Sequence, residues 1–203
     1  MPELHRYVKT SWGYMKRSMD VDTNTPFLLF VGGADRRRKL EDVVTVFNNL
    51  RAQGYAIKLI LAGDSMQGAS SIATEEIQSA LLTSSYLDEI IFMGFVDDKT
   101  RDWLYTHALA FVFPSRYEGF GLPVLEAMIQ GSPVISYRNL ATQEVAADAI
   151  IYADNLLSLS DAVKKLLSYS VGERAELVKI GKDRAELYDW RKTSKTIISS
   201  LLN

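Results

Sequence analysis

The sequence contains no cysteine and only two histidines in 203 residues. The absence of cysteine excludes disulfides and metal sites built on thiolates. With His5 and His107 as the only imidazoles, we expect no zinc site. A chain without cysteine also fits a cytoplasmic location.

Two further absences narrow the class of protein. The formal net charge is only −2, so the chain lacks the basic character of a nucleic-acid binder. The longest apolar runs, such as Phe27–Val31 and Ala108–Phe113, are too short to span a bilayer. Charged residues interrupt positions 1–18, so we do not expect a signal peptide there. The composition that remains, 47% hydrophobic and 24% charged, is typical of one ordinary globular domain.

Apolar runs alternate with helical patterns from Phe27 onward. Six predominantly apolar runs are typical of strands buried on both faces: Phe27–Gly33, Ile57–Ala62, Ile90–Met93, Leu109–Phe113, Val134–Tyr137 and Ala149–Tyr152. Helical spacing lies between them, over Leu40–Gln53, Glu75–Thr83, a segment from Asp97 or Asp98 to His107, and Leu122–Gln130. This order predicts a Rossmann-like, doubly wound α/β domain: a parallel sheet of about six strands with helices on both faces. We assign this domain to residues 27–190, with a helical lead-in and linker over 1–26 and a C-terminal helix over 191–203.

Glycines and one polar loop mark the ends of the predicted strands. In doubly wound folds the ligand lies beyond the carboxyl ends of the strands. Gly32-Gly33, Gly63, Gly94 and the loop 114–121 each follow a strand. We therefore expect them to lie along one edge of the sheet, and we place the binding site there.

The loop and the helix after it carry two glutamates. Gly119 and Gly121 leave the backbone free to approach a ligand, and the following helix directs unpaired N–H groups at it. A carboxylate accepts hydrogen bonds from both hydroxyls of a vicinal diol, so Glu126 could hold a ribose and Glu118 a sugar ring. The same spacing also fits plain turn glycines and a surface glutamate, and spacing alone leaves both interpretations open.

Four adjacent cations, Arg36 to Lys39, follow the first glycine pair. They would complement a diphosphate. The alternative is a solvated charge run at the start of a helix. Cations oppose the helix dipole at that end, which favours the anion-binding interpretation.

Other patterns carry less information. Asp20-Val-Asp22 has the spacing of a metal-binding pair, but it lies in a polar connector before a strand, where a turn is the better interpretation. The sequence has no P-loop, no Gly-x-Ser-x-Gly and no intact dinucleotide-binding fingerprint. The missing fingerprint argues against a dehydrogenase.

The stretch PSRYEGFGLPVLEAM, with its E-x7-E spacing from Glu118 to Glu126, followed by GSPVIS, resembles the motif of retaining GT-B glycosyltransferases. This group includes bacterial mannosyl-, rhamnosyl- and N-acetylhexosaminyl-transferases of cell-surface polysaccharides. Val31–Arg38 is similar to its phosphate loop, Gly94-Phe95-Val96 to its third strand end, and Tyr188–Trp190 to its C-terminal aromatic pair. Arg38 stands where the family usually has lysine.

The resemblance implies a role for each candidate residue. Glu118 would be the catalytic-site residue that holds the transferred sugar, Glu126 would bind the ribose, and Val96 would contact the base. Arg37 and Arg38 would bind the donor diphosphate. The remaining donor-binding positions are Gly32, Gly33, Gly63, Gly119, Phe120, Gly121, Leu122, Pro123 and Val124.

The expected function is therefore that of the C-terminal, donor-binding half of a GT-B enzyme. Such an enzyme moves a sugar from a nucleoside-diphosphate sugar to an acceptor hydroxyl without a metal cofactor. Only 26 residues precede Phe27, too few for an acceptor domain. We expect a longer polypeptide or a partner to supply that domain and contact with a lipid-linked acceptor at the inner face of the membrane, and we expect the isolated chain to be inactive. The alternative is a non-catalytic nucleotide-sugar-binding subunit or sensor.

Overall fold

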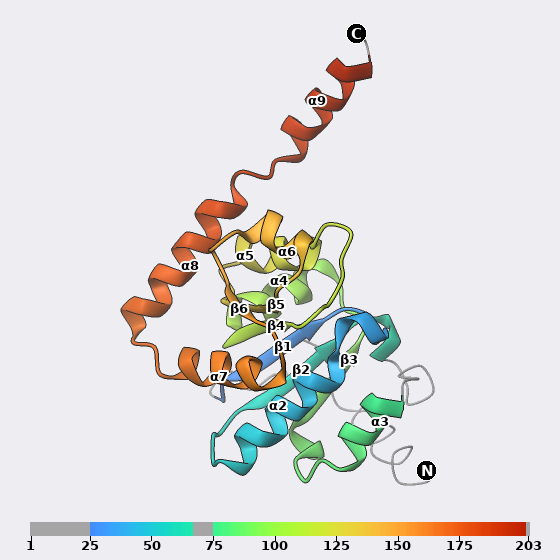
Figure 1. The fold of residues 1–203 in the computed structure, drawn as a ribbon, viewed down its shortest axis with the longest axis vertical. Coiled ribbons are helices and arrows are strands. Elements are labelled where there is room, and N and C mark those ends of the chain that lie inside the picture. Colours follow the sequence, from blue (N-terminus) through green and yellow to red (C-terminus); the bar gives the residue numbers. More distant parts are fainter. Residues whose placement is uncertain (1–24, 67–74, 202–203) are drawn as a thin grey trace.

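A computed structural model describes residues 25–66 and 75–201. Most of the predicted lead-in, including Asp20-Val-Asp22, lies outside the described residues. Six parallel strands form one sheet in the order β3-β2-β1-β4-β5-β6 (Figure 1). The strands are β1 (Phe27–Val31), β2 (Lys58–Ala62), β3 (Ile90–Gly94), β4 (Ala110–Phe113), β5 (Val134–Tyr137) and β6 (Ile151–Ala153).

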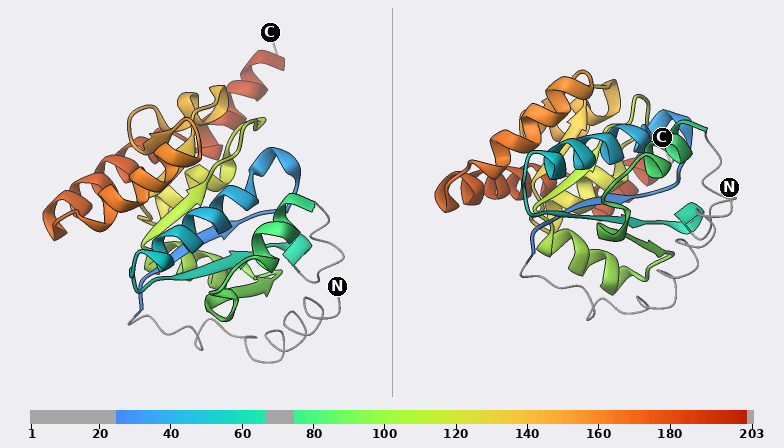
Figure 2. Two further views of the ribbon diagram at one scale, coloured as in Figure 1. Left: turned by 60° about the horizontal axis from the view of Figure 1, so that its bottom comes forward. Right: turned by 90° about the horizontal axis from the view of Figure 1, so that it is seen from below.

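Helices cover both faces of this sheet, as the sequence predicted. They are α2 (Leu40–Ala52), α3 (Glu75–Leu82), α4 (Asp98–His107), α5 (Leu122–Ile129), α6 (Leu140–Ala146), α7 (Leu156–Leu167), α8 (Val171–Ala185) and α9 (Trp190–Leu201). Helix α2 packs against α3 and α7, whereas α5 packs against α4, α6 and α8 on the other side of the sheet (Figure 2). The Rossmann-like fold class is therefore confirmed.

From Phe27 onward, each predicted strand and helix has a counterpart within about two residues of its predicted ends, and Asp97 caps α4 by accepting from the N–H of Thr100. Helix α6 was not predicted. It has only seven residues, and a capping box between Asn139 and Thr142 holds its first turn. A helix this short shows little periodicity, so its hydrophobic pattern does not predict it.

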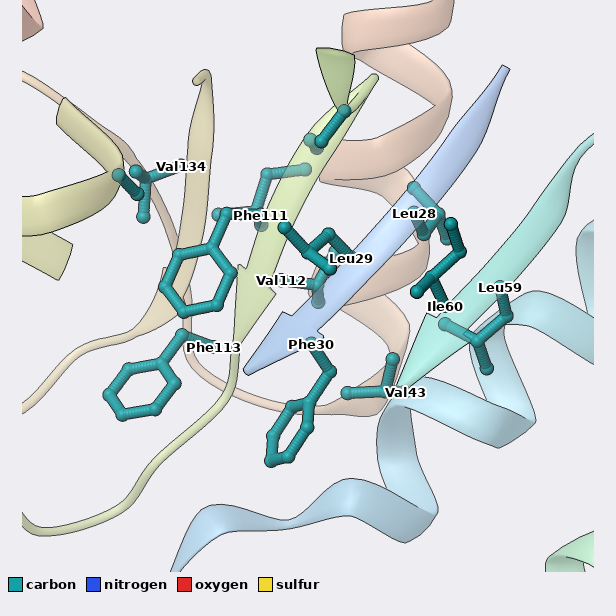
Figure 3. Close-up of a cluster of buried hydrophobic side chains, with 14 of the residues drawn as sticks. Leu28, Leu29, Phe30, Val43, Leu59, Ile60, Phe111, Val112, Phe113 and Val134 are labelled. Carbon is teal, nitrogen blue, oxygen red and sulfur yellow. The ribbon is translucent and has the colours of Figure 1, made fainter. Parts of the chain in front are cut away.

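The central strands β1 and β4 are apolar throughout because both of their faces are buried. Leu28, Leu29 and Phe30 of β1 are inaccessible to solvent, and so are Phe111 and Phe113 of β4. Figure 3 shows side chains of β1 and β4 side by side in this core. A run without polar interruption is thus the expected sequence of these central strands.

The strand order has a direct consequence for the site. The chain moves outward from β1 through β2 to β3, then returns to the other side of β1 and moves outward through β4, β5 and β6. The order reverses between β1 and β4. In folds of this kind a ligand usually lies beyond the carboxyl ends of the strands at such a reversal.

The two last helices lead away from the sheet. Helix α8 lies along α5, and α9 continues outward beyond the body of the domain (Figure 1). Among the described residues, no helix combines the length and the apolar character needed to cross a membrane.

Candidate functional site

The predicted site segments meet at the carboxyl edge of the sheet. Gly32 N–H donates to the carbonyl of Ala62 at 2.8 Å, and Gly63 N–H donates to the carbonyl of Gly94 at 2.8 Å, so the ends of β1, β2 and β3 lie side by side. The turn after β1 is joined to the loop after β4 by a bond from Arg116 N–H to the carbonyl of Arg37 at 2.8 Å. These segments therefore lie together at the reversal of strand order.

The loop after β4 presents a row of backbone donors. In the described part of the chain, no acceptor lies within hydrogen-bonding reach of the N–H groups from Glu118 to Leu122. Gly121 is the N-cap of α5 in the left-handed conformation, with φ 98°, and thereby turns the chain into the helix. This row of N–H groups beside a helix N-terminus suits an anion or sugar hydroxyls.

Val124 was predicted as a donor-binding position, but it adds no free N–H to this row. Its N–H already donates to the carbonyl of Gly121 at 3.0 Å, and its side chain is buried in the core. Pro123 has no N–H at all. The donors available to a ligand therefore end at Leu122, whose side chain is exposed.

Glu118 is held from both sides. Its Oε2 lies 2.7 Å from Arg37 Nη1, and its Oε1 lies 3.6 Å from Arg38 Nε. Ser115 Oγ donates to Oε1 at 2.8 Å. The Glu118 side chain is only 9% exposed. In this state both oxygens of the carboxylate have protein partners.

The run of four cations divides into two pairs. Arg36 is 77% exposed and pairs with Glu76, and Lys39 pairs with Glu41. Only Arg37 and Arg38 face Glu118. The four cations therefore do not form one anion-binding group, and within the loop after β4 Ser115 and Gly121 are buried.

The argument from the helix dipole also needs correction. Arg36–Arg38 form a separate 3₁₀ turn, and α2 begins only at Leu40, after Lys39 in the left-handed conformation. The first turn of α2 carries Glu41 and Asp42, which the dipole favours. The cations therefore do not oppose α2, and the case for an anion site rests on where Arg37 and Arg38 point.

Glu126 lies on α5 and is anchored at one oxygen only. Tyr105 OH and Arg101 Nε, both from α4, approach Oε2 at 3.5 Å and 3.7 Å. Burial raises the pKa of the Glu126 carboxyl above its ordinary value of 4.5, and the charge of Arg101 opposes this shift. The same carboxylate, together with burial, raises the pKa of the Tyr105 hydroxyl. Oε1 of Glu126 has no partner among the described residues, which leaves it for a ligand.

Sequence reasoning missed several residues that support the two glutamates. Tyr105 was interpreted only as part of a helix, although its buried hydroxyl faces Glu126. Ser115 is buried next to Glu118, and its carbonyl accepts from Asn139 Nδ2 at 2.8 Å. The one signal in the sequence was a polar residue two positions after a fully buried strand.

Val96 lies in the turn between β3 and α4, partly buried against the core, beside the exposed Phe95. Among the described residues, no three Asp, Glu or His side chains lie close enough together to hold a metal ion.

The strand order, with its reversal between β1 and β4, defines a Rossmann-like domain of the kind found in GT-B glycosyltransferases. Residues 15–184 match the family "Glycosyl transferases group 1". The chain therefore belongs to this family of glycosyltransferases.

Three relatives illustrate the match. O-antigen chain mannosyltransferase B of Escherichia coli is 48% identical over 65 residues, which are 32% of this chain and 17% of the relative. The structure of sucrose-phosphate synthase from Thermosynechococcus elongatus superposes with a TM-score of 0.76 and 26% identity, over 91% of this chain and 47% of that one. Anabaena HepE, solved in complex with UDP and glucose, has a TM-score of 0.75 and 16% identity, over 88% of this chain and 48% of that one. The chain spans about half the length of these solved structures and less of the mannosyltransferase.

Proposed function

We propose that this chain is the donor-binding domain of a retaining glycosyltransferase that moves a sugar from a nucleoside-diphosphate sugar to an acceptor hydroxyl, in the synthesis of a bacterial surface polysaccharide. Membership of the group 1 family supports sugar transfer. The observation that carries the donor-binding role is the pairing of Arg37 and Arg38 with Glu118, on the loop after β4 whose N–H groups have no acceptor among the described residues. Cations, backbone donors and a carboxylate together match a diphosphate joined to a sugar.

Each group has a place in this proposal. Arg37, Arg38 and the N–H groups from Gly119 to Leu122 would bind the diphosphate. Glu118 would accept from hydroxyls of the transferred sugar, and Oε1 of Glu126 would accept from the ribose. The base would lie near Val96. The mannosyltransferase and the UDP complex of HepE fit such a donor.

The chemistry that these residues supply is electrostatic. As the sugar leaves, negative charge builds on the departing diphosphate, and preorganised donors aimed at that charge lower the barrier. Two guanidiniums and a row of N–H groups can do this without a metal. The acceptor side of the reaction would be supplied from outside this domain, because one donor-binding edge positions only one of the two reactants.

The direct test is titration calorimetry with two ligand pairs, UDP with UDP-glucose and GDP with GDP-mannose. We expect at least one pair to bind, with the same affinity in the presence of EDTA as in its absence. At a hundred times its dissociation constant the ligand should stabilise the fold by about 2.7 kcal/mol. Binding by neither pair would refute the donor-binding role, and binding that requires a divalent cation would refute the metal-free site.

The raised pKa of Glu126 predicts a dependence of nucleotide binding on pH. The ionised carboxylate is the form that accepts from both ribose hydroxyls, so affinity should fall as the pH drops through the raised pKa, before it reaches the ordinary value of 4.5. The raised pKa means that the folded state binds the Glu126 proton more tightly than the unfolded state does. Protonation of Glu126 therefore stabilises the fold, so a loss of binding in this pH range is not caused by unfolding through Glu126. Titrations at a series of pH values check this, with Glu126→Gln as the control that should lose the dependence.

A further inference from the structure

Ser115 is a fully buried polar residue directly beside the candidate sugar-binding carboxylate. Its hydroxyl lies 2.8 Å from Glu118 Oε1, 3.0 Å from the carbonyl of Tyr117 and 3.5 Å from the carbonyl of Arg37. A serine hydroxyl has a single proton to donate. The carboxylate is both the nearest and the only charged acceptor, so the proton is directed to Oε1 of Glu118.

The position of Ser115 is itself held. Asn139 Nδ2 donates to the carbonyl of Ser115 at 2.8 Å, and Asn139 is fixed as the N-cap of α6. Ser115 lies just beyond β4, whose residues are buried throughout. The hydroxyl thus belongs to the rigid part of the domain rather than to the exposed part of the loop.

Arg37, the partner of Glu118 Oε2, is more exposed than Ser115. Arg37 is 39% exposed and also reaches Asp35 and the carbonyl of Tyr117. An arriving diphosphate would compete with Glu118 for this guanidinium. Oε2 would then be released, whereas Oε1 would stay on Ser115.

We infer that Ser115 is a positioning residue: its hydroxyl fixes Oε1 of Glu118, so that Oε2 is presented to the sugar once the diphosphate has drawn Arg37 away. This inference rests on the proposed function. It assigns to Ser115 the selection of a sugar-bearing diphosphate over a bare one, although Ser115 itself does not touch the sugar.

The test compares two buried serines. Ser115→Ala removes the bond to Glu118. Ser136→Ala is the matched control, because Ser136 is equally buried and its Oγ donates to the carbonyl of Phe113 at the same distance, 2.8 Å. For each variant we measure the affinity for UDP-glucose relative to UDP and for GDP-mannose relative to GDP, together with the melting temperature.

We expect Ser115→Ala to lower the sugar-to-bare ratio of affinities about tenfold and to leave the affinity for the bare nucleotide unchanged, as the loss of one hydrogen bond to a charged group predicts. Ser136→Ala should leave the ratio unchanged whatever it does to stability. In a Glu118→Ala background, Ser115→Ala should have no further effect on the ratio. If alanine prevents folding, Ser115→Cys keeps the shape with a much weaker donor and should lower the ratio in the same direction.

Equal sugar-to-bare affinity ratios in the parent chain and in both Ser115 variants would overturn the positioning role. A Ser115→Ala effect on this ratio that is just as large in the Glu118→Ala background would overturn it too. Either result can occur with nucleotide binding intact, and then only this inference fails. Failure of the parent chain to bind either pair would overturn the proposed function together with the inference.

Discussion

Glu118→Gln should bind inorganic pyrophosphate and bare nucleoside diphosphates more tightly than the parent chain, by about tenfold, or ~1.4 kcal/mol. In the structure Glu118 forms an ion pair with Arg37 at 2.7 Å and lies 3.6 Å from Arg38. Because the Glu118 side chain is largely shielded from water, its negative charge repels an incoming anion. The amide removes that charge and frees both guanidiniums. We therefore expect Glu118 to affect the binding of bare diphosphates as well as that of nucleotide sugars.

Calorimetry with pyrophosphate, UDP and GDP measures this effect. The gain for the nucleotide sugars should be smaller or reversed, because they lose the carboxylate that would hold the sugar. Asp161→Asn is the matched control, since it removes one exposed negative charge from α7, and it should change no affinity. Glu126→Gln should weaken UDP and UDP-glucose alike. Unchanged or weaker pyrophosphate binding by Glu118→Gln would show that the ion pair does not compete with the diphosphate.

Gly63→Ala should destabilise the fold by roughly 3 kcal/mol or more and abolish donor binding. Gly63 has φ +144°, a conformation that is essentially restricted to glycine. A Cβ there would lie 2.2 Å from the carbonyl oxygen of Gly32, and a backbone atom cannot rotate away as a side chain can. The end of β1, which precedes Arg37 and Arg38, would have to shift. Gly63 therefore affects the site indirectly, through its packing against Gly32 in the turn after β1.

Gly119→Ala provides the contrast for this experiment. A Cβ on Gly119 meets no atom within 4 Å, so the melting temperature should stay close to that of the parent chain. Thermal and denaturant unfolding of the two variants checks the comparison. A Gly63→Ala chain as stable as Gly119→Ala would contradict the close approach between the ends of β1 and β2.

Most of the fold could be predicted because the signals for it are local. A strand buried on both faces is apolar without interruption, as in Phe27–Val31, and an amphipathic helix such as α2 repeats its apolar residues at helical spacing. These signals also locate the carboxyl edge of the sheet, since each glycine stop follows a strand. Helix α6 was not predicted, because its seven residues show too little of the helical spacing of apolar residues.

The side chains of the site were predicted less completely. Glu118, Glu126, Arg37 and Arg38 were assigned by resemblance, and their roles stay predictions. Their partners could not be found in the same way. Tyr105 has the spacing of an ordinary core residue, and Ser115 has no property in the sequence that ties it to Glu118.

By itself, the sequence determined the class of fold, the order of its elements and the edge of the sheet at which the glycines and the loop 114–121 lie, because burial and periodicity are local properties of short stretches of chain. The ligand at that edge stays a prediction. Only the tertiary structure decided which two of the four adjacent cations face Glu118 and that the N–H of Val124 is already bonded to Gly121. It also decided that one oxygen of Glu126 has no partner in the described part of the chain. Neighbouring cations look alike along the chain. Their directions depend on the 3₁₀ turn and on a loop that lies far away in sequence, and these meet only when β1 and β4 pair in the sheet.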